Sequence, residues 1–99
     1  MAEKTSAPMT LSVLTPQGED SKTLCDSVQL TLSDDAQGRG GGLIGIRRGH
    51  RRAVMALGSG VVRASLGGET VFLARTQGGF ASVRDNVVAV IADSVEKEM

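Results

Sequence analysis

The densest group of side chains that could bind a charged partner lies between positions 47 and 52. Arg47, Arg48, Arg51 and Arg52 surround Gly49 and the only histidine, His50. Guanidinium groups bind carboxylates and phosphates through paired hydrogen bonds. The segment therefore predicts a contact with an acidic partner surface or with anionic lipid headgroups. A basic rim that faces only solvent is the alternative.

Catalytic and metal chemistry have little support in this sequence. His50 has no cysteine or carboxylate at a metal-ligand spacing near it, and no Gly-x-Ser-x-Gly segment is present. We therefore expect no metal site, no catalytic residue and no enzymatic activity. The prediction for His50 is a turn residue whose ring bonds the backbone.

A glycine-rich segment, DDAQGRGGG at positions 34–42, could in principle cradle a phosphate with its N–H groups. A phosphate loop, however, needs Gly-Lys-Ser or Gly-Lys-Thr at the start of a helix, whereas here the glycines lead into Leu43 and an apolar strand. We expect a flexible connection and no bound cofactor. A free-standing β-domain that binds anions or RNA through this loop and the arginine segment is the alternative function.

Composition argues against nucleic acid as the partner and for a small β-protein. The chain has 99 residues with formal net charge zero, and its only two aromatic residues are Phe, which leaves little for base stacking. Thirteen glycines separate short apolar runs, a pattern typical of an all-β fold. The prediction is a small β-sandwich or flattened barrel of about 8–10 short strands, with at most a short C-terminal helix. The lone Cys25 is expected to be a buried apolar residue.

Alternating apolar residues locate the strands. Met9, Leu11 and Val13 predict the first strand, and Gly67-Gly68 predicts a type I′ turn between two later ones. Apolar residues at both alternations of segment 87–92 predict a last strand covered on both faces. Phe80, at the start of the final hairpin, is expected in the core.

The two ends of the chain carry different expectations. Residues 1–8 lack periodicity and predict a flexible leader. Residues 9–93 are expected to form the sandwich domain. Asp93 and Ser94 are possible N-caps, so the short tail of residues 94–99 is expected to start a helix.

Several motifs together resemble one known family. The final hairpin reads TQGGFASVRDNVVAVIADSVE, and it follows ALGSGVVR at positions 56–63 and a Gly45-Ile46, Gly49-His50 pair. This set resembles the β-sandwich domain of the epsilon subunit of F-type ATP synthases, over residues Met9 to Glu96. The resemblance implies a non-catalytic central-stalk subunit of a proton- or sodium-translocating ATP synthase, which couples rotation of the c-ring to the gamma subunit and to ATP synthesis.

The resemblance also implies partners, a location and a site. The partners would be the gamma subunit and the polar loops of the c-ring, with no nucleic acid and no direct membrane insertion. The protein would be peripheral, on the cytoplasmic side of the membrane. Arg48 and Arg52 stand where the family usually has prolines, and Leu43 where many members have an acidic residue. The family's second domain, a C-terminal pair of helices, is expected to be absent from this chain. The resemblance implies that the following residues face the c-ring: Leu43, Arg47, Arg48, His50, Arg51 and Arg52.

Overall fold

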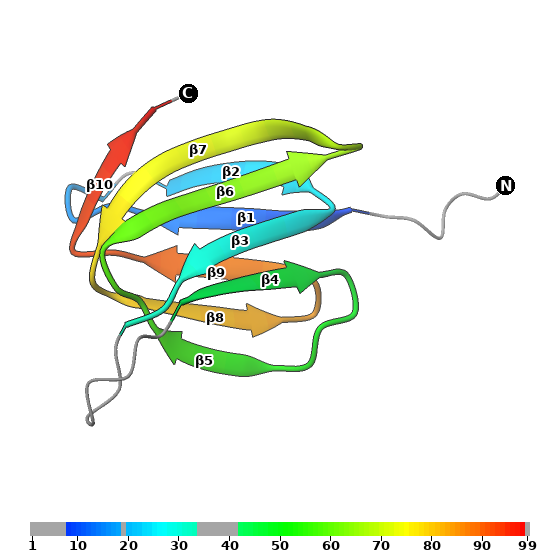
Figure 1. Cartoon of the computed structure of the whole chain (residues 1–99), viewed down its shortest axis with the longest axis horizontal. Helices are drawn as coiled ribbons and strands as arrows, with labels where there is room; N and C mark the ends of the chain where they lie inside the picture. The colour runs from blue at the N-terminus through cyan, green and yellow to red at the C-terminus, as the bar shows by residue number, and fades with distance from the viewer. Residues whose placement is uncertain (1–7, 19, 34–41, 99) are drawn as a thin grey trace, which may run out of the picture.

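Two five-stranded β-sheets pack face to face in the computed structural model, which describes residues 8–18, 20–33 and 42–98 (Figure 1). Within these ranges there is no helix, and the predicted all-β sandwich is confirmed. The predicted flexible leader, apart from Pro8, and the glycine-rich loop, apart from Gly42, lie outside the described residues.

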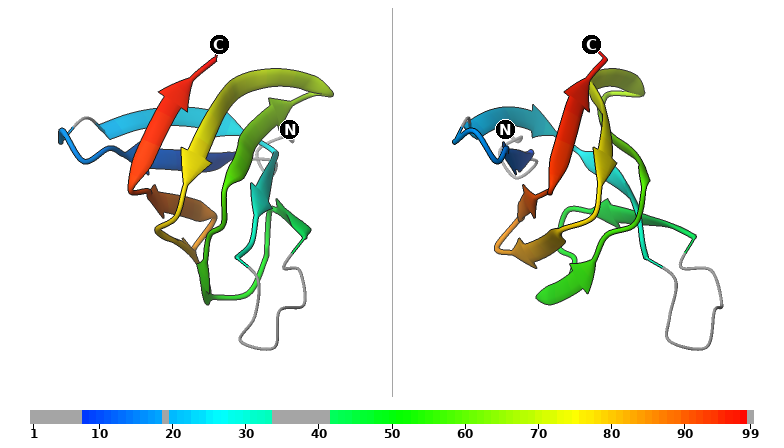
Figure 2. Two further views of the ribbon diagram at one scale, coloured as in Figure 1. Left: turned by 60° about the vertical axis from the view of Figure 1, so that its left-hand side comes forward. Right: turned by 90° about the vertical axis from the view of Figure 1, so that its left-hand side faces the viewer.

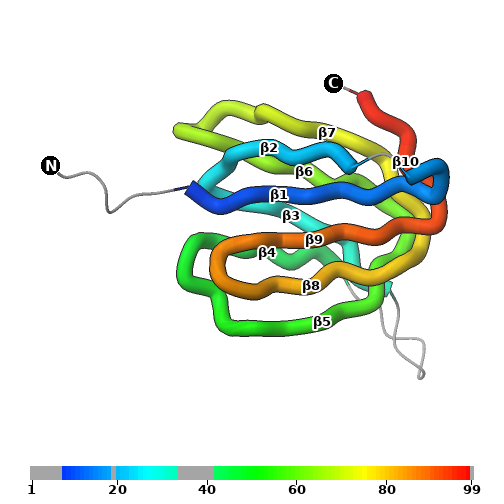
Figure 3. Tube along the Cα trace, turned by 180° about the vertical axis from the view of Figure 1, so that it is seen from behind, coloured from blue at the N-terminus to red at the C-terminus, as the bar shows by residue number. Residues whose placement is uncertain are grey.

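The first sheet has the strand order β2-β1-β9-β8-β5. Strand β1 pairs with β2 in antiparallel and with β9 in parallel orientation, whereas β9, β8 and β5 are antiparallel neighbours. All five strands lie in front when the molecule is seen from behind (Figure 3). Their bounds are β1 Met9–Leu14, β2 Asp20–Cys25, β5 Ala53–Ala56, β8 Phe80–Arg84 and β9 Val87–Ile91.

The second sheet has the order β10-β7-β6-β3-β4, and all its pairs are antiparallel. The turned views show the two sheets as separate layers, with β10 beside β7 (Figure 2). The bounds are β3 Ser27–Thr31, β4 Leu43–Arg47, β6 Gly60–Leu66, β7 Glu69–Gln77 and β10 Ser94–Lys97.

The core lies between the sheets and is filled by alternate residues of the strands, because successive side chains of a strand point to opposite faces. In β1 the inward residues Met9, Leu11 and Val13 are at most 1% exposed. Cys25 is also buried, as predicted, and burial together with the nearby Asp26 carboxylate raises the pKa of its thiol. The core therefore holds an unreactive thiol. The other buried apolar residues are Val28, Leu30, Ile46, Leu57, Val62, Ala64, Phe72, Ala74, Ala81, Val83, Val88, Val90 and Ala92.

Two tight hairpin turns follow from residues that tolerate positive φ. Gly67 and Gly68 have φ of 61° and 86°, which confirms the predicted type I′ turn between β6 and β7. Asp85 and Asn86 adopt φ of 52° and 65° between β8 and β9. Asn and Asp enter this left-handed region more readily than other non-glycine residues.

The prediction of a helix after Ala92 is wrong. Residues Ser94–Lys97 form strand β10, which pairs with β7, and Glu98 N donates to Leu73 O at 2.8 Å beyond it. A helix of so few residues is not stable in isolation, even with a capping residue at its start. Pairing along the edge of the second sheet satisfies its backbone groups and packs Val95 against the core.

Phe80 is 59% exposed, so its predicted place in the core is also wrong. The neighbouring Ala81 points inward, and strand alternation therefore turns Phe80 outward. The expectation that both faces of the last strand are covered fails for the same reason. Val88 and Val90 are fully buried, whereas Val87 is 41% exposed.

Candidate functional site

The connection between β4 and β5, residues 47–52, is called here the arginine end. Gly49, with φ of 85°, forms its turn, and His50 N donates to Arg47 O at 3.1 Å. Gly49 N donates to Asn86 Oδ1 at 2.8 Å. The β8–β9 turn of the first sheet is thereby hydrogen-bonded to the arginine end. Both connections lie at the same end of the molecule (Figure 3).

His50 is half-buried, and its ring Nδ1 lies 2.7 Å from Arg51 O. This contact confirms the prediction of a turn residue whose ring bonds the backbone. Among the described residues, no group of His, Cys, Asp and Glu side chains could hold a metal ion. The histidine thus has a structural partner within the arginine end.

The arginines of this segment are all exposed, and the first and last of them lie on different faces of the sandwich. Arg47 follows the buried Ile46, so it lies on the outer face of the second sheet, where it lines a hollow together with Arg63. Arg52 instead lines a hollow with Val54 and Arg84 on the first sheet. Arg47 and Arg52 therefore point to the two opposite outer faces of the sandwich.

Leu43 lies apart from the other predicted contact residues. It begins β4 opposite Thr31 and is 64% exposed, whereas Arg47 ends the same strand. At about 3.3 Å per residue, the two Cα atoms are about 13 Å apart along β4. The residues predicted to face one partner thus occupy two opposite ends of a strand.

An apolar surface that the sequence analysis missed crosses the outer face of the first sheet. One row crosses four strands through the pairs Leu14 with Ile91, Ile91 with Phe80, and Phe80 with Ala56. Six of the nine exposed large hydrophobic residues in the described part of the chain lie on this face. We call it the apolar face, and it comprises Leu14, Leu24, Val54, Ala56, Phe80, Val87, Ala89 and Ile91.

Charged and polar groups border the apolar face. Asp20 accepts hydrogen bonds from Ser12 Oγ at 2.8 Å and from Lys22 Nζ at 2.6 Å. The bond from Lys22, and then that from Ser12, lowers the pKa of Asp20. On the other side Arg84 Nε lies 3.6 Å from Asp85 Oδ2. An apolar centre with a polar rim is the usual anatomy of a protein interface.

The sequence contained a signal for this surface. Both alternations of β9 are apolar, and Phe80 opens the neighbouring strand. Exposed apolar residues that occur singly need no explanation, but a contiguous patch marks an interaction site. The pattern of β9 therefore indicated an apolar outer face, and the sandwich itself leaves that face open.

Comparison with known proteins shows the family to which the chain belongs. Residues 8–98 match the family described as ATP synthase, Delta/Epsilon chain, beta-sandwich domain. The chain belongs to this family. Two relatives named ATP synthase epsilon chain, from Desulfitobacterium hafniense strains DSM 10664 / DCB-2 and Y51, are each 34% identical over 87 residues. That match covers 88% of this chain but 60% of each relative, so the chain spans about three fifths of their length.

Solved structures of ATP synthases share the fold. A chain in the Euglena gracilis mitochondrial ATP synthase, in a structure of OSCP/F1/c-ring, superposes with a TM-score of 0.72 at 20% identity, over 92% of this chain and 54% of that one. A chain in the central stalk/c-ring structure of the Tetrahymena thermophila enzyme gives 0.63 at 14% identity, over 89% and 65%. In the part of our chain that the structure describes, no helix is long and apolar enough to cross a membrane.

Proposed function

We propose that this chain is the sandwich module of an ATP synthase epsilon subunit and serves the central stalk without an active site of its own. The observation that carries the proposal is the apolar face, which needs a protein partner to cover it. The relatives at 34% identity are named epsilon chains, and the fold matches chains from ATP synthase structures. The apolar face would pack on the gamma subunit.

A two-layer sandwich suits a part that transmits torque. Its core is continuous between the sheets, and β1 links β2 and β9 in one ladder across the first sheet. Close-packed interiors transmit strain because they compress little. In the proposed role the module turns with gamma and passes the rotation of the c-ring on without changing shape.

We further propose that the arginine end contacts the polar loops of the c-ring. Four exposed guanidinium groups follow one another along this connection, and guanidinium groups bind carboxylates bidentately, so acidic loops would be their complement. Leu43 lies at the opposite end of β4, and we place the centre of the contact at the arginine end. Arg47 and Arg52, which face the two outer surfaces, would flank the contact made by Arg48, His50 and Arg51.

Cysteine crosslinking tests the ring contact and distinguishes the two ends. Cys25 is buried, so single cysteines at Arg48 and at Leu43 can be labelled selectively with a photoreactive maleimide. In the assembled enzyme we expect c-subunit crosslinks from Arg48→Cys and none from Leu43→Cys. Crosslinks from Leu43→Cys alone would move the ring contact to the other end and contradict the proposal.

The stalk role itself is tested by recovery of partners. The tagged chain, expressed with the other subunits, should recover gamma from mildly solubilised membranes, and the complex would place it at the membrane surface on the cytoplasmic side. The anion-binding alternative would be favoured instead if the tagged chain recovered no gamma and the isolated chain bound RNA or another polyanion in a salt-sensitive manner.

A further inference from the structure

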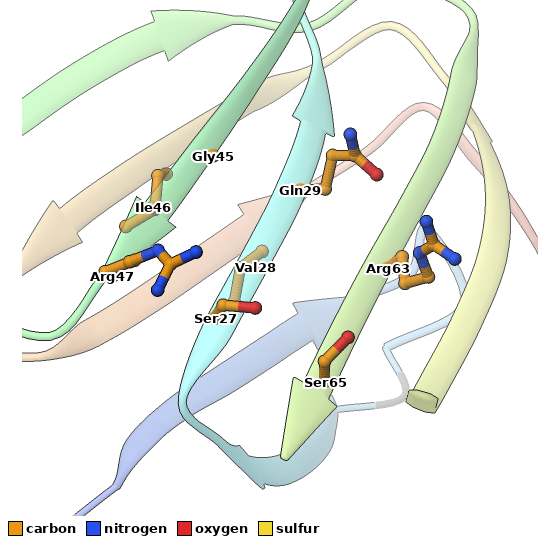
Figure 4. Close-up of a pocket in the computed structure, with 8 residues that line it drawn as sticks. All are labelled: Ser27, Val28, Gln29, Gly45, Ile46, Arg47, Arg63 and Ser65. Carbon is orange, nitrogen blue, oxygen red and sulfur yellow. The ribbon is translucent and has the colours of Figure 1, made fainter. Parts of the chain in front are cut away.

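We propose that the hollow on the outer face of the second sheet binds a protein segment that carries two carboxylates. The hollow lies across β4, β3 and β6, on the opposite face of the sandwich from the apolar face (Figure 4). It shares Arg47 with the arginine end, but the proposal does not depend on the stalk role.

The polar side chains of the hollow come from facing positions of three strands. Ser27 pairs with Arg47 on β4 and with Ser65 on β6, and Gln29 pairs with Arg63. Figure 4 shows Arg47 and Arg63 on opposite sides of strand β3. The surface therefore offers two guanidinium groups, two hydroxyls and an amide.

The floor of the hollow is open because Gly45 has no side chain. Gly45 faces Gln29 across the strand pair, and a Cβ there would meet no atom within 4 Å. The resulting space of about 220 Å³ is several times that of a water molecule, about 30 Å³. It has room for side chains from a partner.

The residues that line the hollow include no negative charge that would balance its arginines. Two arginines and no acidic residue line the hollow. Asp26 stands next to Ser27 but does not line it, and its Oδ2 accepts a hydrogen bond from Gly67 N at 2.9 Å. The complementary group is therefore an oxyanion, and guanidinium forks bind carboxylates bidentately.

The spacing of the arginines favours two carboxylates over one small ion. Two strand spacings of about 4.8 Å and an offset of two residues place the Cα atoms of Arg47 and Arg63 about 12 Å apart. In an extended segment, acidic residues two positions apart point the same way and lie about 7 Å apart. The arginine side chains bridge the difference. Two carboxylates would give each guanidinium group a partner of its own, whereas a single small ion would have to be shared between them.

Binding of a labelled oligoglutamate peptide to the whole chain tests the proposal. Fluorescence anisotropy at physiological ionic strength should show binding that the double variant Arg47→Ala/Arg63→Ala weakens roughly threefold or more, because two solvent-screened ion pairs are lost together. The matched control is Arg75→Ala/Arg84→Ala, which removes the same charge from exposed arginines paired with Glu98 and Asp85. This control should bind as the unmodified chain does.

Each other outcome overturns the proposal. Equal weakening in both double variants would indicate general charge attraction. The hollow would be a small-ion site if inorganic phosphate competed with the peptide and its binding depended on Arg47 and Arg63 in the same way. It would be a nucleic-acid site if single-stranded RNA behaved in this manner. Absence of peptide binding would leave the hollow without the proposed occupant. Thermal unfolding of all variants checks that the fold is intact.

Discussion

The two outer faces of this sandwich differ more than the two sheets that carry them. Each sheet is five-stranded and buries one face in the same core. The first sheet then presents apolar residues to its other side, among them Ile91 and Phe80, 57% and 59% exposed. The second presents Ser27, Gln29 and Arg63 around an open hollow. Two surfaces of different chemistry on opposite faces are what the two proposed partners of one small module require.

The largest expected effect separates the two phenylalanines. Phe72 on β7 is 3% exposed, and Phe80 on β8 is 59% exposed. Phe72→Ala should lower the free energy of unfolding by about 3–5 kcal/mol through lost burial and a cavity. Phe80→Ala should lower it by less than about 1 kcal/mol, since it removes surface contacts only. Chemical denaturation measures both, and similar losses would mean that the apolar face is part of the core.

A smaller effect is expected at the turn that supports the arginine end. Asn86→Ala removes the hydrogen bond from Gly49 N and places an alanine at φ of 65°. The bond contributes about 1 kcal/mol and the left-handed backbone costs about 1–2 kcal/mol, so we expect a loss of about 2–3 kcal/mol.

Asn86→Gly is the matched control, because glycine tolerates the backbone angle and loses only the bond. It should destabilise the protein by about 1 kcal/mol in the same denaturation experiment. If Asn86→Ala and Asn86→Gly were equally stable, backbone strain would have no part in the cost.

The smallest effect concerns Asp20 at the rim of the apolar face. Its pKa in the folded chain lies below the ordinary value of 3.8, first because of Lys22 and then because of Ser12. A carboxyl whose pKa is lower in the folded than in the unfolded chain stabilises the fold at pH values above its unfolded pKa. This stabilisation is lost as the pH falls through the folded pKa. NMR titration of the Asp20 carboxyl should show a larger upward pKa change in Lys22→Ala than in Ser12→Ala. An unchanged pKa in Lys22→Ala would contradict the assignment of that rim contact.

Much of the fold could be predicted from local patterns. Alternation in segment 9–14 located β1, and Gly67-Gly68 fixed a turn, because both signals depend on neighbouring residues alone. The tail at 94–97 could not be predicted in this way. It is a strand because β7 offers a free edge, and the edge comes from residues distant in sequence.

The candidate site was harder to predict for the same reason. Proximity in sequence suggested that Arg47 and Arg52 share a surface, but a strand end and a turn separate them onto two faces. Arg63 and Arg47, by contrast, are distant in sequence and share a surface only because β3 pairs with both of their strands, β6 and β4. The sequence shows neither fact. An apolar residue such as Phe80 likewise carries no mark that tells a core position from an interface position.

The most direct test of the account is the affinity of the chain for the gamma subunit, its proposed partner, when the apolar face is charged. Phe80→Asp and Ile91→Asp should each weaken gamma binding roughly tenfold or more, as expected for residues at the centre of an interface. The control is Leu66→Asp, which places the same charge at a 41% exposed apolar residue of the second sheet. Calorimetric titration with purified gamma should show full affinity for Leu66→Asp. Unchanged affinity of Phe80→Asp and Ile91→Asp, with the fold intact, would contradict the claim that the apolar face is where gamma binds.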